Sequence, residues 1–180
     1  MSQWKIISRK SVFKAKLFEV REIIFKNKNG QEKVHHIAQR NTVVTIFPLT
    51  DKYEIYLISQ YRYMLNKVVL EAVSGYVDKK ETTIAAAKRE LKEESGMEAG
   101  QLEEIARIEM AGSVFKSKGH LFLAKGLEIG ENKPEEDEEI SIVKIPLSMA
   151  VEKVMVGEIN HSATMIGILM LDKLRMQRKL

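Results

Sequence analysis

The segment from residue 75 to residue 97 constrains the fold of this 180-residue chain more than any other part of the sequence. Thr82 or Thr83 can cap a helix that continues to Ser95, and three alanines favour it. Gly96 suits the left-handed position that often follows the last helical turn. At about 100° per residue, three apolar positions are predicted to form the buried stripe of this helix: Ile84, Ala87 and Leu91.

Acidic residues lie beside that stripe. Glu90 and Glu94 are one helical turn apart, and Glu93 adds a third carboxylate. Like charges at this spacing repel, so a purely structural helix gains nothing from them. A divalent cation would remove the repulsion, and hard oxygen ligands of this kind suit Mg²⁺, which also binds substrate phosphates. The alternative is a solvated, charge-rich helix supported by a pair between Arg89 and Glu93.

The rest of the sequence predicts an α/β fold. An Asn- and Gly-containing turn at residues 27–30 indicates a hairpin, and two more helices are expected at residues 146–157 and 163–177. The runs 43–49 and 53–59 are apolar enough for central strands buried on both faces. Because strands precede and follow the helices, we expect a mixed sheet with helices on its faces. The other strand-like segments are residues 4–8, 18–25, 34–38, 105–110, 120–124 and 140–145.

Composition narrows the classes of partner. The chain has no cysteine, which excludes disulfides and thiolate metal sites and fits a cytoplasmic location. The net charge is only +4 and the lysines form no dense run, so we expect no nucleic-acid partner. No segment has the apolar core of a signal peptide, and none approaches the roughly 20 apolar residues of a membrane span, so we expect no membrane partner.

Residues 75–97 match the Nudix box, G-x5-E-x7-R-E-U-x-E-E-x-G-U with U a bulky apolar residue, at every defined position. Seven fixed identities coincide by chance on the order of 10⁻⁸ per starting position. The chain therefore resembles the Nudix hydrolase superfamily, and its ADP-ribose pyrophosphatase or nucleoside diphosphate sugar hydrolase branch in particular. Val73 and Ser74 stand where that branch usually has proline and alanine. Four segments carry the wider resemblance: Gln60–Tyr63, Leu70–Gly75, Glu135–Ile140 and Gly157–Asn160.

The resemblance implies a two-part architecture. Residues 43–180 would form the Nudix α/β/α sandwich with its mixed sheet, and residues 1–42 a small N-terminal antiparallel β domain. In that family the N-terminal strands build a dimer, so we expect a homodimer. Three or four short strands without a helix also make a poor independent core, which favours a partner subunit.

The resemblance also implies the chemistry. It predicts Mg²⁺-dependent hydrolysis, with Mn²⁺ as a possible substitute, of the pyrophosphate bond of ADP-ribose or a related nucleotide sugar. The products would be a nucleoside monophosphate and a sugar phosphate. Arg89 would orient the glutamates and Glu81 would support the loop. The implied metal ligands are Glu90, Glu93, Glu94 and the backbone carbonyl of Ser74.

The water-activating carboxylate is expected in the acidic run 135–139. Within it, Glu136 is favoured as the general base and Glu138 as a partner on the metal side. A metal-bound carboxylate is a poor proton acceptor because the cation lowers its pKa, which is why a separate carboxylate is wanted. Taken alone, the run would be a solvated acidic turn. If the loop supplies only an electrostatic field, the other candidates for the base are Glu93 and a metal-bound hydroxide.

Four residues are candidates for holding the substrate: Arg40, Arg62, His35 and Phe18. The two arginines can grip phosphate oxygens with paired hydrogen bonds, and the alternative for each is a surface salt bridge. Strand alternation places His35 and His36 on opposite faces, so at most one faces a ligand. Phe18 can stack on a base, or form a core or dimer contact instead.

Other functions are compatible with the same pattern. One is broader cleavage of nucleoside diphosphate sugars, including GDP-mannose. Another is clearance of nucleoside triphosphates or RNA 5′ ends, against which the long N-terminal segment argues, because minimal triphosphatases lack it. A third is a non-catalytic nucleotide-sugar sensor, which normally has a degraded box or an added DNA-binding domain. Neither feature is present in this sequence.

Overall fold

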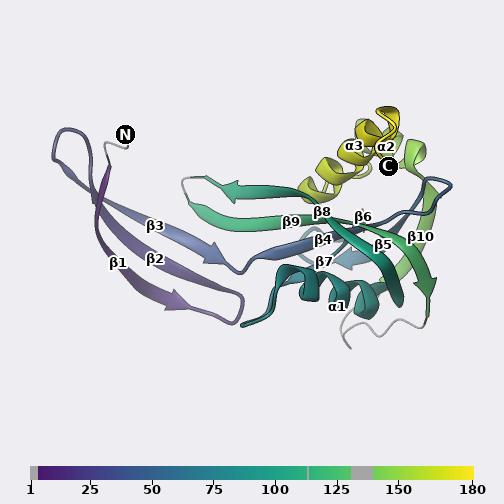
Figure 1. Ribbon diagram of the computed structural model, residues 1–180. Coiled ribbons are helices and arrows are strands. Elements are labelled where there is room, and N and C mark those ends of the chain that lie inside the picture. The colour runs from purple at the N-terminus through teal and green to yellow at the C-terminus, as the bar shows by residue number, and fades with distance from the viewer. Residues whose placement is uncertain (1–3, 113, 131–139) are drawn as a thin grey trace. The chain divides into compact units, whose positions relative to one another are not determined.

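The computed structural model describes residues 4–112, 114–130 and 140–180 (Figure 1). The chain divides into two compact units, which we call the N-terminal unit (Met1–Thr42 with Ile108–Gly119) and the main unit (Val43–Arg107 with His120–Leu180). The sequence analysis had assigned residues 108–119 to the second part of the chain. Whether the units are independent domains, as the predicted boundary at residue 42 implies, stays a prediction. Within the described residues, no helix is both long and apolar enough to cross a membrane.

The N-terminal unit is built on an antiparallel meander of three strands, β1 (Lys5–Lys14), β2 (Phe18–Lys26) and β3 (Glu32–Arg40). The predicted hairpin is present: the side-chain oxygen of Asn27 accepts two backbone N–H groups, and Gly30 has a φ of 78°. The end of β3 also pairs in parallel with the start of β9 (Phe115–Ile129). No residue between 4 and 42 is buried, so these strands have no core of their own.

Two groups of strands form the main unit. In one, β4 (Val43–Pro48) lies between β7 (Val73–Tyr76) and β9, and β8 (Met97–Ala111) pairs with β9. In the second group of strands, β5 (Glu54–Arg62) is central and antiparallel to the strand on each side of it. The two runs that the sequence marks as central strands are thus central in different sheets, and an isolated bridge between Leu49 and Ile55 links them. The second sheet consists of β10 (Ile140–Pro146), β5 (Glu54–Arg62) and β6 (Lys67–Glu71).

Helices cover both faces of β4. Its alternate residues Val44 and Ile46 are fully buried in a cluster with Leu91 of α1 (Thr83–Ser95). Alternation places Phe47 on the opposite face, where its ring packs against Gly167 of α3 (Ser162–Met176). The contact is so close that no side chain fits at position 167. Figure 1 shows α1 on one side of the main-unit strands and the other two helices on the opposite side. Those helices are α2 (Leu147–Met155) and α3 (Ser162–Met176).

Helix α1 forms where the sequence predicts it. The Thr82 hydroxyl caps it by accepting the Ala85 N–H at 3.2 Å, and Gly96 ends it in the left-handed conformation with φ 68°. The predicted buried stripe was wrong at Ile84, which is 46% exposed although it shares a helical face with the buried residues. Burial requires a neighbouring element to cover the side chain, and in the first turn of α1 this cover reaches Ala86 but not Ile84. Ala86 is fully buried in its place.

Candidate active site

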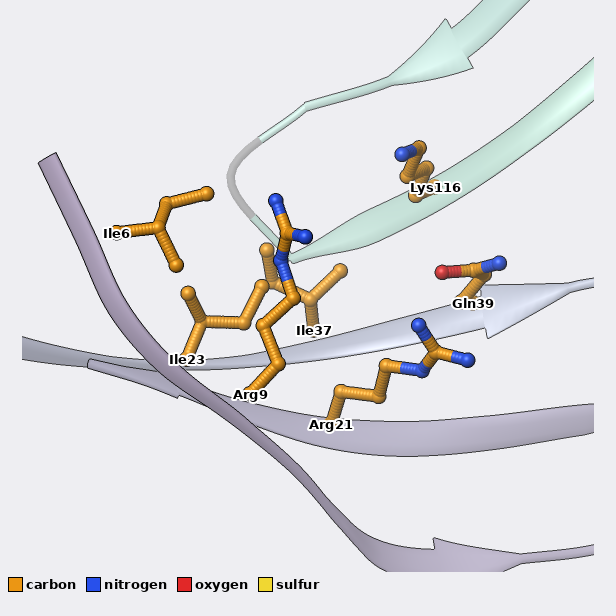
Figure 2. Close-up of a pocket in the computed structure, with 7 residues that line it drawn as sticks. All are labelled: Ile6, Arg9, Arg21, Ile23, Ile37, Gln39 and Lys116. Atoms are coloured by element: carbon orange, nitrogen blue, oxygen red, sulfur yellow. The ribbon is translucent and has the colours of Figure 1, made fainter. Parts of the chain in front are cut away.

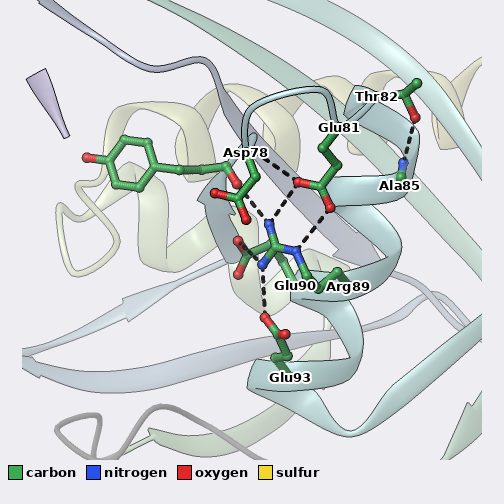
Figure 3. Close-up of polar contacts among 8 residues, drawn as sticks. Asp78, Glu81, Thr82, Ala85, Arg89, Glu90 and Glu93 are labelled. Carbon is green, nitrogen blue, oxygen red and sulfur yellow. Dashed lines mark hydrogen bonds and ion pairs between the residues drawn. The ribbon is translucent and has the colours of Figure 1, made fainter. Parts of the chain in front are cut away.

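Arg89 donates hydrogen bonds to carboxylates of helix α1 and of the loop before it (Figure 3). Its Nε and Nη2 donate to the two oxygens of Glu81, both at 3.1 Å. Its Nη1 donates to Glu90 at 2.8 Å and to Glu93 at 2.9 Å, and its Nη2 also donates to the Tyr76 carbonyl at 2.9 Å. One guanidinium therefore holds three acidic side chains and the end of β7 in fixed positions.

The electrostatics follow from that arrangement. The hydrogen bonds from Arg89 hold the pKa of the Glu81 carboxyl below its ordinary value, although burial opposes the shift. The same contacts, first to Glu81 and then to Glu90 and Glu93, raise the pKa of Arg89. Glu81 also accepts the Asp78 N–H at 3.0 Å, so it ties the loop between β7 and α1 to the helix. The guanidinium offsets the repulsion among the glutamates.

Two carboxylates lie between α1 and β7. Glu94 is only 5% exposed, and one of its oxygens accepts the Ser74 N–H at 3.0 Å. The Glu90 carboxylate lies directly over Gly75, where a Cβ atom would come within 1.9 Å of its Cδ. Glycine is thus required at position 75 for Glu90 to approach the strand. Helical periodicity had predicted that both carboxylates lie along the seam between helix and sheet, and the structure places both there.

The strand beneath these carboxylates is anchored from the opposite side. Ala72 links β6 to β7, and its N–H donates to the Thr164 hydroxyl of α3 at 3.0 Å. Thr164 is fully buried and also contacts His161 Nδ1 at 2.9 Å. Helix α3 therefore fixes the chain two residues before Ser74. Thr164 was not among the predicted site residues, and the available signal was a polar residue within the otherwise apolar run 163–171.

A second ion pair lies on the neighbouring sheet. Arg62 donates to Glu71 at 2.7 Å, and Glu71 is 5% exposed. The side-chain oxygen of Gln60, two residues before Arg62 on β5, is buried without a hydrogen-bond partner in the described part of the chain. Sequence reasoning selected Arg62 but missed its partner Glu71. The signal was a glutamate within the apolar run of β6, because a carboxylate there needs a cation.

The other predicted substrate residues belong to the N-terminal unit. Phe18 and Arg40 are directly opposite each other on β2 and β3, so their side chains share a face. Arg40 Nε donates to Ser117 Oγ at 3.1 Å, and its guanidinium lies 5.4 Å from the Phe115 ring centroid. His35, five residues before Arg40, faces the other way and contacts the Phe25 ring edge-on. The structure therefore brings Phe18 and Arg40 together and separates His35 from them.

Comparison with known proteins identifies the family. The sequence matches the NUDIX domain family over residues 39–164, more than half of the chain. The chain belongs to the Nudix family. It is 28% identical to the methanol dehydrogenase activator of Bacillus methanolicus and 27% identical to ADP-ribose pyrophosphatase of Bacillus subtilis (strain 168). Each of these two alignments spans 166 residues, 91% of this chain and 90% of the relative.

A solved structure extends the likeness to the whole chain. The crystal structure of ADP compounds hydrolase has a TM-score of 0.85 with 26% sequence identity, and the alignment covers 100% of this chain and 98% of that one. The predicted α/β Nudix fold is thereby confirmed. The box residues, Glu71 and Thr164 all lie within the matched residues 39–164.

The Nudix-box residues offer oxygen atoms of the kind that a divalent cation prefers. Glu90 and Glu94 present hard oxygen atoms at a strand that carries the Ser74 carbonyl, and such oxygens suit a divalent cation. Glu93 is instead 48% exposed on its side chain and paired with Arg89. Within residues 4–112, 114–130 and 140–180, no three acidic or histidine side chains are grouped as a metal site. The candidates Glu136 and Glu138 lie outside the described residues.

Proposed function

We propose that this chain is a Nudix pyrophosphohydrolase that cleaves the pyrophosphate bond of ADP-ribose or a related nucleoside diphosphate sugar. The products are a nucleoside monophosphate and a sugar phosphate. The observation that carries the proposal is the intact, Arg89-ordered set of box glutamates on α1 against β7. Two similar proteins, named ADP-ribose pyrophosphatase and ADP compounds hydrolase, support this class of substrate.

We propose that Mg²⁺, with Mn²⁺ as a substitute, is held by Glu90, Glu94 and the Ser74 carbonyl, with Glu93 and Glu138 as further candidate ligands. When bound, the cation would neutralise negative charge on the pyrophosphate and would lower the pKa of a water molecule bound to it. The chain's own residues then have separate tasks. Arg89 keeps Glu90 and Glu93 in place, and the Ser74 N–H orients Glu94. These hydrogen bonds limit side-chain rotation before substrate arrives.

Proton transfer is assigned to the acidic loop. We propose Glu136 as the general base and Glu138 as its partner on the metal side, because the box glutamates are committed elsewhere. The test is a set of single substitutions to Gln, or to Asn at Asp137, across residues 135–139, with kcat measured against pH at saturating Mg²⁺. One position is expected to lose at least about 10²-fold in kcat together with the acidic limb of the profile. A uniform, mild loss across all five contradicts this assignment and favours Glu93.

Substrate contacts are proposed for Arg62, Arg40, His35 and Phe18. Arg62 is the strongest candidate, because its pairing with Glu71 uses Nη2 and fixes the direction of the guanidinium, whose Nε and Nη1 can still donate to a phosphate. Phe18 and Arg40 share a face of the β2–β3 pair, so both can contact the same substrate molecule, Phe18 at the base and Arg40 at a phosphate. His35 would need a ligand on the opposite face.

The deciding experiment is a panel of nucleotide sugars. The purified chain is incubated with ADP-ribose, other ADP-sugars, UDP-glucose and GDP-mannose, with Mg²⁺, with Mn²⁺ and with EDTA, and release of monophosphates is measured. We expect ADP-ribose to be among the best substrates and EDTA to abolish the activity. Preferential cleavage of GDP-mannose would select the broader NDP-sugar alternative. Tight binding of ADP-ribose without any hydrolysis would select the sensor.

We further propose that the chain is a cytoplasmic homodimer joined through its N-terminal strands. The support is the exposure of large apolar side chains on strands that bury nothing themselves. Examples are Phe13 on β1 at 55% exposure and Val34 on β3 at 52%, together with Trp4 just before β1 at 57%. A second copy of the chain would remove such surface from water.

A further inference from the structure

The N-terminal unit contains a hollow lined by three cationic side chains (Figure 2). Arg9 of β1, Arg21 of β2 and Lys116 of β9 point toward its interior, together with the amide of Gln39. Its volume is about 320 Å³, which is the size of a small-molecule site. All the lining residues belong to this unit, whereas the Nudix-box glutamates belong to the main unit.

The cations of the hollow are only partly neutralised. Arg21 pairs with Glu19, its neighbour on the same face of β2. Neither Arg9 nor Lys116 contacts a carboxylate within the described part of the chain. Glu22, the next acidic residue of β2, lies on the opposite face and pairs with His36. The hollow therefore carries a surplus of two positive charges.

This surplus matches the distribution of charge along the chain. Residues 1–42 contain ten Lys and Arg but only three Glu and no Asp, a surplus of seven. The whole chain carries a net charge of +4, so the remainder is acidic overall. The excess of positive over negative charge is thus concentrated in the N-terminal part of the chain. A concave surface of one charge sign attracts ions of the opposite sign.

The other wall of the hollow is apolar. Ile6, Ile23 and Ile37 line it beside the cations, and Ile6 is 46% exposed. Two unpaired cations balance a phosphate monoester dianion, and two guanidinium groups and an amide can donate to its oxygens. An apolar wall next to such a group suits a ligand with an organic part as well as a phosphate. A bare inorganic anion would leave the isoleucines uncovered.

We propose that this hollow is a second ligand site, which binds a small organic phosphate through Arg9, Arg21 and Lys116. The phosphate lies against the cations and Gln39, and the organic part covers the three isoleucines. Glu19 holds the Arg21 guanidinium in position for the phosphate. This site is independent of the hydrolysis proposed above, because it uses no residue of the Nudix box.

The test is isothermal titration of the full chain in EDTA, with AMP and inorganic phosphate as probes. Without a divalent cation, the negatively charged box glutamates repel phosphate. A loss of AMP binding in a variant of the hollow then separates this site from the proposed substrate contacts of Arg62, Arg40 and Phe18. The test variant is R9Q/K116Q. The matched control is K10Q/K118Q, which removes the same charge from the same two strands at positions that do not line the hollow. Sedimentation and thermal unfolding of each variant are measured in parallel.

We expect the unsubstituted chain to bind AMP more tightly than inorganic phosphate. The test variant is expected to lose at least about tenfold in AMP affinity, and the control less than about twofold, because each lost charge-assisted hydrogen bond weakens binding directly. If the double variant fails to fold, the single variants R9Q and K116Q give the same readout. The proposal is overturned if AMP does not bind, if inorganic phosphate binds equally well, or if both variants lose affinity alike. It is also overturned if R9Q/K116Q alters sedimentation while AMP binding is unchanged, because a second copy would then occupy the hollow.

Discussion

Arg89 and Glu94 show how single side chains organise the Nudix box. Arg89 contacts Glu81, Glu90 and Glu93 at once, so the repulsion among the glutamates is offset before any cation binds. Glu94 is held by the Ser74 N–H instead and is the most buried of the box glutamates. The hydrogen bonds of Arg89 and of the Ser74 N–H therefore hold the negatively charged glutamates of α1 in an ordered arrangement, which is what a metal-dependent site requires.

Substitution E94Q is expected to preserve the fold and remove the activity. The amide oxygen of glutamine can still accept the Ser74 N–H, but the side chain no longer carries the charge that favours a cation. We expect kcat for ADP-ribose to fall at least about 10²-fold, with little change in the thermal unfolding midpoint. The control is E98Q, which removes the same charge from an exposed residue paired with Lys92. Equal activity in E94Q and E98Q would contradict the assignment.

Substitution R62A is expected to affect both binding and stability. Removing the guanidinium takes away a phosphate contact and leaves the buried Glu71 carboxylate without its cation. We expect KM for ADP-ribose to rise about tenfold or more, and the unfolding midpoint to fall. E71Q separates the two effects, because it also breaks the ion pair but retains the arginine. If KM in R62A equals KM in E71Q, Arg62 acts only through the ion pair.

At the scale of elements, the site depends on two close approaches. Helix α1 comes near β7 because Gly75 leaves room for the Glu90 carboxylate. Helix α3 comes near β4 because Gly167 leaves room for the Phe47 ring. Thr164 of α3 then anchors the link between β6 and β7. The strand that carries Ser74 is therefore held by a helix on each side.

Substitution G75A is expected to reduce kcat while leaving the chain folded. The added Cβ would lie 1.9 Å from Glu90 Cδ, so the carboxylate must move, and it can do so because it ends a flexible side chain. We expect a loss of about 10²-fold in kcat, the scale of a displacement of about 1 Å at a catalytic group. G112A serves as the control, since nothing lies within 4 Å of its added Cβ. Full activity in G75A would show that the position of Glu90 is not critical.

At the scale of the whole molecule, the two units differ in how they bury their side chains. The main unit has a core that includes Val44, Ile46, Leu91 and Phe122, all exposed by 2% or less. The strands at residues 4–42 have no buried residue. Three strands that expose apolar side chains on both faces gain stability when another surface covers them.

The chain is therefore expected to sediment at micromolar concentration as a dimer of the 20.6 kDa protomer. Phe13→Glu, at a side chain that is 55% exposed on β1, is expected to shift the equilibrium toward the monomer, because burying an unpaired carboxylate is costly. Met155→Glu, at a 73% exposed residue of the main unit, is the control and should leave the mass unchanged. A monomer in the unsubstituted chain would contradict the dimer.

Local features were predictable from the sequence alone. The limits of α1, its Thr82 cap and its Gly96 end depend on hydrogen bonds and φ angles within a few residues, and all three were confirmed. The placement of Glu90 and Glu94 beside the buried face follows from helical periodicity. The Nudix family follows from the box itself, and the family match confirms it. The roles of these residues in metal binding and catalysis stay predictions.

Only the tertiary structure decided the contacts between distant segments. Periodicity could not show that Ile84 lies outside the covered part of its turn, or that the adjacent strands β4 and β5 enter different sheets. Nor could it show that Glu71 pairs with Arg62 or that Thr164 holds Ala72, 92 residues away in the sequence. The physical reason is that periodicity reports which face of an element is apolar, whereas burial and pairing depend on which other element covers that face.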